Sequence, residues 1–376
     1  MYLAIREMRF AKGRYALIAT IMVLVAFLVL FVTGLAQGLA YDNAASVKNM
    51  TATHFVLEQN SNHRFTRSQL DKNQLDQARL TVGESNAEPL GVKMTTVIPA
   101  GDTKKVDVTL FMVNPDGWLS PTVSEGSSIS EQQVGQVMVD RKLSESGVQL
   151  GSMIEDQASG MQWTVSGFVE NESFSHSPVV FLNDQDWLKL QARSSTSSGA
   201  DNAAESIVYN AIAMKGSSAD QIENVVKAMP GTEVITKSEA ISAIPGYKEE
   251  QGSLVMMIAF LFVISAFVLA VFFYVITIQK TSQFGILKAI GTGTAYLAKS
   301  VALQVLVLSV GSLLISVLLV QAFESILPAT MPFQLGFSTL VLTCVSFVVM
   351  SLAGSLFSVW KVAKIDALDA IGRTAA

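Results

Sequence analysis

Four stretches of roughly 20 apolar residues, none containing Lys, Arg, Asp or Glu, constrain this chain more than any other feature of its sequence. A helix of that length crosses the ~30 Å hydrocarbon core of a bilayer. The four stretches are residues 16–35, 254–278, 301–320 and 339–359. They predict an α-helical integral membrane protein with four transmembrane helices, and they leave residues 36–253, between the first and second spans, as one large domain.

The basic residues outside the spans predict which side of the membrane each segment occupies. Short cytoplasmic segments retain Lys and Arg. Residues 36–253 are net acidic and the loop 321–338 has no basic residue, so we expect both to be extracellular. We therefore expect a multi-pass protein of the plasma (cytoplasmic) membrane with both termini cytoplasmic. The basic residues on the expected inner side are Arg6, Arg9, Lys12 and Arg14 in 1–15, Lys280, Lys288 and Lys299 in 279–300, and Lys361, Lys364 and Arg373 in 360–376.

Residues 1–15 mix apolar and basic side chains, which is typical of an amphipathic helix lying on the inner membrane surface. A rival interpretation, a cleaved signal peptide, has small residues at 35–40 in its favour, but the apolar stretch is too long for one. Near the outer end of the first span, Gly34 and Gly38 form a small-xxx-small step. This step predicts close helix packing, as in a dimer, or simply a loosened helix end.

Residues 36–253 alternate between strand-like and helix-like patterns, which predicts an extracellular α+β domain. Capping-box patterns at Thr66 with Gln69 and at Ser130 with Gln133 predict two helix starts. Residues 193–205, rich in Ser, Ala and Gly, predict a mobile loop. The expected strands are 54–59, 90–98, 105–113, 162–169, 178–181, 206–214 and 233–236, and the expected helices are 66–80, 130–143 and 218–229.

The residue types needed for catalysis or metal binding are scarce. The single cysteine, Cys344, lies in the fourth span, so the large domain has no disulfide and depends on its own core. The three histidines are scattered, and a dedicated His/Cys metal site is not expected. The chain has no Walker A, G-x-G-x-x-G or H-E-x-x-H pattern. We therefore expect no enzyme active site, no intrinsic cofactor and a partner that supplies the energy.

The inner loop, residues 279–300, is the most informative segment. Its apolar residues mark one side of a short helix, which would dock in a partner's groove or lie on lipid headgroups. These residues are Phe284, Ile286, Leu287, Ile290 and Leu297.

Three segments resemble a known family. Residues 283–291, QFGILKAIG, resemble the E-x-G-I-L-R-A-L-G signature of FtsX-like (MacB-type, type VII) ABC transporter permeases. Residues 360–372, WKVAKIDALDAIG, resemble the closing helix of that family, and residues 3–10 resemble its first helix. Two departures are visible, because Gln283 replaces the usual acid and Ala367 the usual proline.

The resemblance implies a homodimer of permeases with two copies of a separate ABC ATPase subunit, which binds the ATP. It also implies mechanotransmission, in which closure of the ATPase pair moves the inner helices and, through them, the outer domains. The ATPase would couple to Phe284, Gly285, Ile286, Leu287 and Lys288. Membrane lipid is a further expected partner, and nucleic acid is not.

Within this family the chain is most similar to the haem efflux permeases, so haem is the expected substrate. The substrate-binding candidates are Glu249, Glu250, Met256, Met257 and Tyr41, with Met256 and Glu249 as possible iron ligands. Glu249 and Met256 are about 10 Å apart along a helix, too far to ligate one iron from opposite sides within one chain. Across a dimer axis, a Glu and a Met from the two protomers would flank the ring.

Other interpretations of the same residues remain open. A methionine in a membrane helix usually packs, and a glutamate at a span boundary usually faces water. The alternative functions are a permease of this family for a lipoprotein, a peptide or a drug, or a regulator of a cell-wall hydrolase. An extracellular sensor is disfavoured, because the cytoplasmic segments are too short for a signalling domain.

Overall fold

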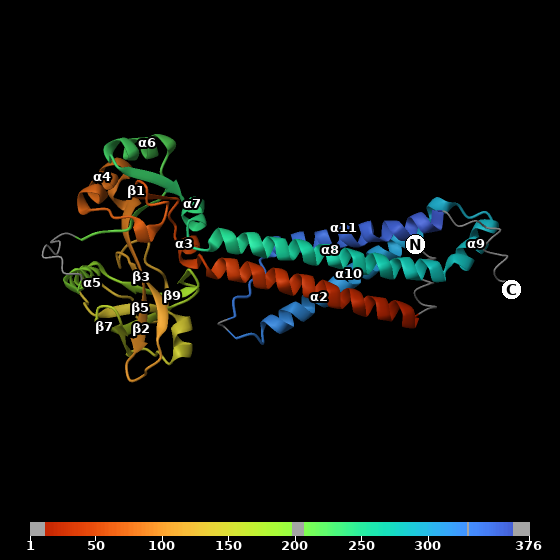
Figure 1. The fold of residues 1–376 in the computed structure, drawn as a ribbon, viewed down its shortest axis with the longest axis horizontal. Coiled ribbons are helices and arrows are strands. Elements are labelled where there is room, and N and C mark those ends of the chain that lie inside the picture. The colour runs from red at the N-terminus through yellow and green to blue at the C-terminus, as the bar shows by residue number, and fades with distance from the viewer. Residues whose placement is uncertain (1–11, 198–206, 329–330, 364–376) are drawn as a thin grey trace. The chain divides into compact units, whose positions relative to one another are not determined.

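The computed structural model describes residues 12–197, 207–328 and 331–363, and the chain divides into two units (Figure 1). The helical unit comprises residues 1–39 and 252–376, and the domain unit comprises residues 40–251. The predicted amphipathic helix at 1–15 and the predicted tail at 360–376 lie mostly outside the described residues.

The helical unit contains four helices that are long and apolar enough to span a membrane, which confirms the predicted fold class. Each extends beyond its uncharged stretch at both ends. The helices are α2 (Lys12–Asp42), α8 (Tyr247–Gln279), α10 (Thr294–Glu324) and α11 (Phe337–Ala363), with the short α9 (Thr281–Ala289) between α8 and α10.

Small and polar side chains help to pack these helices. α10 and α11 lie along one another, and Ser316 of α10 donates from Oγ to the carbonyl oxygen of Val23 on α2 at 2.9 Å. Lipid gives membrane helices no hydrophobic drive to associate, so close van der Waals contact and such hydrogen bonds hold them together. The buried core of the unit is formed by Tyr15, Ile18, Met22, Ala26, Leu30, Leu269, Phe273, Val305, Leu313, Val320 and Phe347.

The domain unit is α+β, as predicted, and is built on a mixed sheet. Its strands are β1 (His54–Glu58), β2 (Ala87–Pro99), β3 (Val106–Met112), β4 (Val123–Gly126), β5 (Gln136–Asp140), β6 (Met153–Asp156), β7 (Gln162–Val169), β8 (Ser173–Phe174), β9 (Ser177–Leu182), β10 (Ala211–Met214) and β11 (Thr232–Thr236). Its helices are α3 (Ala45–Asn49), α4 (Lys72–Val82), α5 (Asp184–Ser197), α6 (Ala219–Ala228) and α7 (Lys237–Ser242), with 3₁₀ turns η1 (Phe65–Arg67), η2 (Glu84–Asn86) and η3 (Arg141–Ser146).

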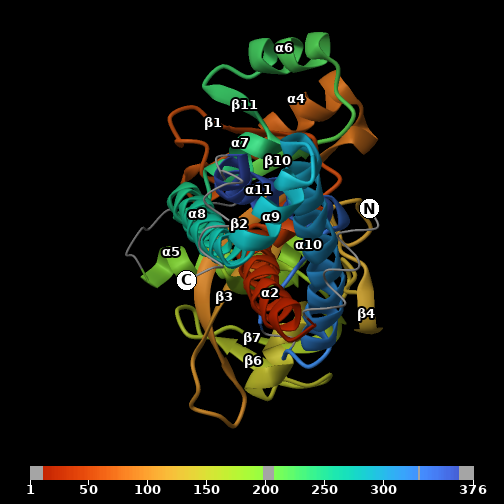
Figure 2. The same cartoon turned by 90° about the vertical axis from the view of Figure 1, so that its right-hand side faces the viewer.

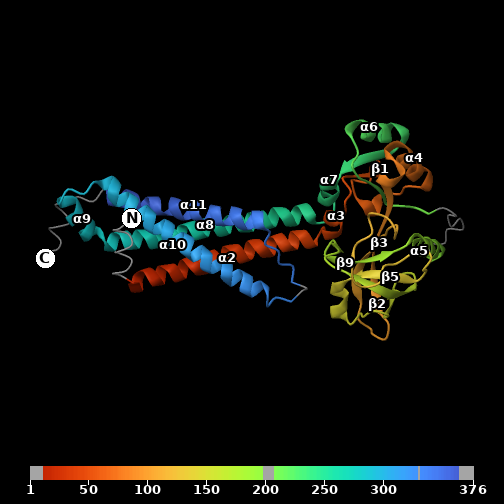
Figure 3. The same cartoon turned by 180° about the vertical axis from the view of Figure 1, so that it is seen from behind.

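The sheet runs in the order β11-β1-β10-β2-β3-β9-β5-β7-β4. The β3–β9 and β5–β7 pairs are parallel, and the other pairs are antiparallel. β2, with 13 residues, is long enough to pair with three strands, β10, β3 and β6. It is therefore the central strand of the sheet. Figures 1, 2 and 3 show β1, α4 and α6 at one end of the domain, with β11 labelled beside β1 in Figure 2, and Figure 1 shows β5 and β7 toward the other end. Two apolar clusters of buried side chains form its core.

Each of the seven predicted strands overlaps an observed strand, and the helix predicted at 218–229 is α6, with its capping box at Ser218 and Gln221. The predicted helix at 66–80 begins too early. Its capping box lies at Asp71 and Gln74, where Gln74 N donates to Asp71 Oδ1 at 2.9 Å. Leu70 pairs with Tyr209 in an isolated bridge, and this keeps the chain extended up to the true helix start.

The predicted helix at 130–143 is wrong. Gln133 N donates to the Ser130 carbonyl oxygen in a turn, and the chain then forms β5 and η3. Val137, Met138 and Val139 are all fully buried, because β5 lies between β9 and β7 with apolar cover on both faces. When a short segment is buried on all sides, its apolar residues follow neither the two-residue period of a strand nor the 3.6-residue period of a helix, so the sequence pattern does not tell the two apart. The predicted loop at 193–205 is also partly wrong, because α5 continues to Ser197, and residues 198–205 lie outside the described residues.

Candidate functional site

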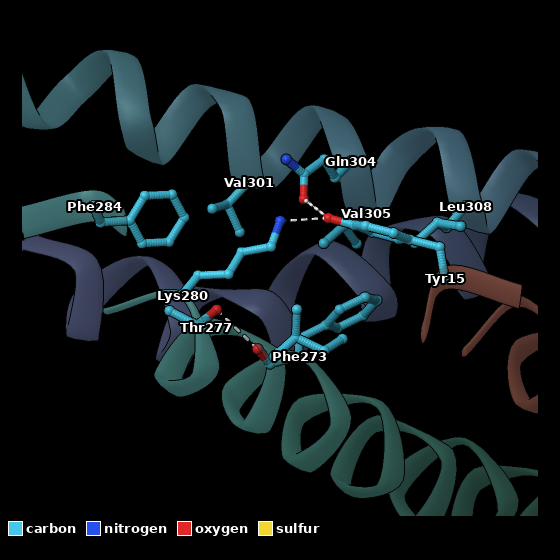
Figure 4. A pocket seen from close by; sticks show the side chains of 10 residues that line it. Tyr15, Phe273, Thr277, Lys280, Phe284, Val301, Gln304, Val305 and Leu308 are labelled. Carbon is cyan, nitrogen blue, oxygen red and sulfur yellow. Dashed lines mark hydrogen bonds between the residues drawn. The ribbon is translucent and has the colours of Figure 1, made fainter. Parts of the chain in front are cut away.

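A buried polar network, which we call the inner joint, links three helices of the helical unit (Figure 4). Lys280, at the corner between α8 and α9, donates from Nζ to the hydroxyl oxygen of Tyr15 on α2 at 2.5 Å. The Tyr15 hydroxyl donates to Gln304 Oε1 on α10 at 2.8 Å. The Lys280 ammonium also lies 5.0 Å from the centre of the Tyr15 ring. Lys280 is only 8% exposed, so these contacts stabilise a largely desolvated cation.

The inner joint borders a small pocket with room for about one water molecule. Figure 4 shows Phe284 of α9 and Val301 of α10 beside the Lys280 side chain. An apolar wall strengthens each polar contact, because the surrounding dielectric constant is low. In the sequence, Lys280 marks only the expected inner side of the membrane, since nothing local pairs it with a tyrosine 265 residues away.

The predicted ATPase-coupling residues fall on two different sides of α9. Phe284 is 1% exposed and packs with Leu297 and Val301 of α10, and Gly285 is buried as well. Leu287 and Lys288 are half-buried. Ile286 is 49% exposed and Ile290, just after α9, is 74% exposed. The prediction that the apolar residues of 284–297 form one side of a single short helix is therefore wrong. Phe284 and Leu297 are buried in the core of the chain itself, whereas Ile286 and Ile290 are exposed.

Gly34 and Gly38 are contacted within the same chain by the segment between α10 and α11. A Cβ atom on Gly34 would collide with the Phe333 ring, and one on Gly38 with the backbone of Pro332. Gln334 N donates to the Gly34 carbonyl oxygen at 3.1 Å. The absence of side chains at Gly34 and Gly38 thus lets the segment between α10 and α11 pack closely against α2. A role of these glycines in dimer packing stays a prediction.

The five predicted substrate-binding residues differ in what they contact. The Tyr41 hydroxyl donates to Asn49 Oδ1 at 2.7 Å, and Glu250 Oε2 accepts from Asn43 Nδ2 at 2.6 Å. The Glu249 side chain is exposed, and Met256 and Met257 on α8 are 58% and 45% exposed.

Acidic side chains gather beside the end of α2 in the domain unit. Asp140 and Glu172 are almost completely buried, and Asp140 Oδ2 accepts from the Glu172 backbone N–H at 2.7 Å. Burial raises the pKa of both carboxyls above their ordinary values, although backbone and side-chain hydrogen bonds oppose it. Asp42 forms an ion pair with Lys142 nearby. Within the described residues, no group of three or more His, Cys, Asp or Glu side chains is arranged to hold a metal ion.

Known proteins match this chain in two ways: a family model matches part of the helical unit, and relatives match nearly the whole chain. Residues 255–367 match the C-terminal domain model of the FtsX-like permeases. The chain is 31% identical over 372 residues to the hemin transport system permease protein HrtB of Staphylococcus haemolyticus and 32% identical over 375 residues to that of Staphylococcus epidermidis, with 99% of each chain covered. It is 25% identical to an ABC transporter permease of Mycobacterium tuberculosis, again over 99% of both.

Two solved structures resemble the domain more distantly. The extracellular domain of the ABC-type transporter YknZ matches 49% of this chain and 99% of its own, with 15% identity and a TM-score of 0.35. The periplasmic region of MacB from Actinobacillus actinomycetemcomitans matches 55% and 97%, with 11% identity and a TM-score of 0.37.

Three findings point to the same family. They are the identity to the HrtB proteins over nearly the full length, the family match at 255–367 and the four apolar helices. This chain belongs to the FtsX-like permeases of ABC transporters, in the family that includes the HrtB hemin transport permeases.

Proposed function

We propose that this chain is the membrane subunit of an efflux pump that extrudes haem from the plasma membrane. It would act as a homodimer, with two copies of a separate ATPase that bind ATP. The observation that carries the proposal is the 31–32% identity to HrtB hemin permeases along 99% of the chain. The distribution of basic residues supports an orientation with both termini and α9 in the cytoplasm and the domain unit outside.

The two sides of α9 support coupling to the ATPase by mechanotransmission. Ile286 and Ile290 leave an exposed apolar surface on which a partner would dock. Phe284, on the other side, packs against α10, so a force on α9 would reach the core of the bundle. The inner joint adds a second connection, from the α8–α9 corner to α2.

The contacts of the predicted substrate residues suggest a narrower haem site. Tyr41 and Glu250 already hold hydrogen bonds to Asn49 and Asn43, so we place them at the edge of the site. Glu249, Met256 and Met257 have exposed side chains on α8. A thioether and a carboxylate are both able to ligate iron, and the apolar ring suits an exposed apolar helix surface in lipid.

The test is a haem titration of the permease purified with its ATPase in lipid nanodiscs. We expect haem to shift the Soret band and to raise ATP hydrolysis several-fold, and we expect co-expression to protect cells from haem. Unchanged Soret and ATPase signals would overturn haem as the substrate but not the assignment of the chain as a permease. The same assay would then be run with lipopeptides and drugs. Failure of any ATPase to co-purify would overturn the coupling proposal.

Variants on α8 localise the haem site. Met256→Ala, Met257→Ala and Glu249→Gln should each shift the Soret band or weaken haem binding if their side chains contact haem. Met22→Leu is the matched control, because Met22 is fully buried in the helical core and its replacement should leave the spectrum unchanged. Wild-type spectra in all three α8 variants would remove this helix from the site.

A further inference from the structure

His176 lies between two carboxylates that come from the two chain segments leaving the domain unit. Its Nε2 is 3.0 Å from Glu250 Oε2 in the first turn of α8, and its Nδ1 is 3.4 Å from Asp42 Oδ2 at the end of α2. Residues 40–42 and 247–251 both belong to the domain unit, so this contact lies within one unit. The ring joins three parts of the unit that are far apart in sequence.

The backbone holds the histidine in this place. Ser175 and His176 form the two-residue turn between β8 and β9, with φ of 51° and 61°. Positive φ at both positions is the geometry of a tight hairpin turn that follows the twist of the strands, and it costs energy for residues other than glycine. Ser175 N donates to the Asn43 carbonyl oxygen at 2.8 Å, so the turn is also tied to the residue after α2.

The protonation state of the ring decides how many of its contacts are favourable. A carboxylate only accepts hydrogen bonds, and a neutral imidazole has a single N–H to donate. A neutral ring would therefore present one lone pair to a carboxylate oxygen. The imidazolium, in contrast, donates from both nitrogens, and hydrogen bonds between charged partners are the stronger kind.

The charges joined by direct ion pairs to the ring and its two carboxylates balance only when the ring is protonated. Asp42 and Glu250 carry two negative charges, and Lys142, which forms an ion pair with Asp42, supplies one positive charge. The imidazolium of His176 supplies the second. The ring is 39% exposed, so protons from the solvent reach it. Other titratable groups on the elements packed around this cluster include Asp140, Glu172, Lys48, Tyr41 and Tyr247, with Lys248 and Glu249 on α8 itself.

We propose that His176 is a proton-dependent latch, in which the doubly protonated ring ties the ends of α2 and α8, through Asp42 and Glu250, to the β8–β9 turn. The latch is closed while the ring carries a proton on both nitrogens. When the ring loses one of these protons at higher pH, the latch loses one of its two arms, and both helix ends then hold the turn less firmly. This goes beyond the proposed haem efflux, because it assigns the domain a response to the pH on its own side of the membrane.

The first test observes the ring itself in the full-length chain. The chain has only three histidines, so selective ¹⁵N-histidine labelling in nanodiscs gives few signals. The His176 signals are those lost in His176→Gln. At acidic pH we expect both of its ring nitrogens to show protonated shifts and hydrogen-bond couplings. A ring that stays neutral at every pH where the protein is folded would overturn the proposal.

The second test follows hydrogen exchange of residues 173–177 and 247–251 as a function of pH, after correction for the intrinsic pH dependence. Loss of one charge-assisted bond should speed corrected exchange about tenfold as the histidine deprotonates. His176→Gln should show the fast exchange at every pH. His63→Gln is the matched control, because His63 faces the single carboxylate Glu233 at 3.4 Å and its replacement should keep the wild-type profile at these segments.

Glu250→Gln keeps the histidine and removes one carboxylate charge, and it should flatten the pH profile even if His176→Gln folds poorly. Identical profiles in wild type, His176→Gln and Glu250→Gln would overturn the latch. These readouts need neither haem nor ATPase, so their failure is distinguishable from failure of the proposed function.

Discussion

Lys280 and Tyr15 hydrogen-bond at 2.5 Å, and this contact ties the corner at which α8 turns into α9 to α2. Tyr15 in turn donates to Gln304 of α10. The inner joint therefore connects the α8–α9 corner to α2 and α10 through polar contacts, in addition to the direct packing of Phe284 of α9 on α10.

Removing the Tyr15 hydroxyl should weaken this connection. We expect Tyr15→Phe to lower the free energy of unfolding by about 1–3 kcal/mol, because a buried cation loses an acceptor. Haem transport per ATP hydrolysed should fall, while ATPase co-purification persists. Thermal unfolding in nanodiscs and transport in proteoliposomes measure the two effects. Tyr274→Phe, on an exposed ring of α8, is the control, and equal transport ratios in both variants would contradict the role of the joint.

The two sides of α9 should respond differently to substitution. Ile286→Asp places a charge on the exposed surface, so the permease should fold but bind its ATPase at least about tenfold more weakly. Ile286→Leu should bind normally. Phe284→Ala should instead destabilise the permease by about 3 kcal/mol, because it opens a cavity between α9 and α10. Pull-down of the ATPase and thermal unfolding separate the effects, and ATPase binding by Ile286→Asp at the wild-type level would favour the headgroup interpretation of α9.

Gly38 should not tolerate a methyl group. We expect Gly38→Ala to destabilise the helical unit by about 1–3 kcal/mol, because the new Cβ collides with the Pro332 backbone. Gly311→Ala on α10 is the matched control, since nothing lies within 4 Å of its Cβ position and alanine favours a helix. The measurement is thermal unfolding in nanodiscs. A neutral Gly38→Ala would show that the loop moves freely away from α2.

Asp184 should make the domain less stable as the pH rises. Burial, aided by the charge of Glu131, raises its pKa from an ordinary value of 3.8 to about 6, against the opposing charge of Arg79. The folded state therefore binds an extra proton between about pH 4 and 6, and stability falls through that window by about 1–3 kcal/mol. Asp184→Asn should match wild type near pH 4 and exceed it at pH 7.

Tryptophan fluorescence reports this unfolding, because Trp187 is buried one turn along α5. Asp76→Asn, at an exposed position on α4, should leave the pH profile unchanged. A wild-type profile that is flat between pH 4 and 7, or an Asp184→Asn profile as steep as wild type, would contradict the prediction.

The spans, the class of the domain and the family could be predicted from the sequence because each depends on local information. Twenty uncharged apolar residues span a bilayer whatever surrounds them, and QFGILKAIG at 283–291 is a contiguous signature. The strand at 162–169 was predicted at its observed bounds because its alternating pattern is contained in the segment itself. The helix predicted at 218–229 and observed as α6 is local in the same way.

Only the tertiary structure decided which partner each residue meets. Residues 136–140 form a strand because β9 and β7 lie on either side, and Phe284 points inward because α10 presents Leu297 and Val301. Phe333 fills the space at Gly34. These contacts join segments far apart along the chain, and no local pattern carries that information. His176 shows the limit most clearly, since the sequence reveals only a scattered histidine and the fold places it between Asp42 and Glu250.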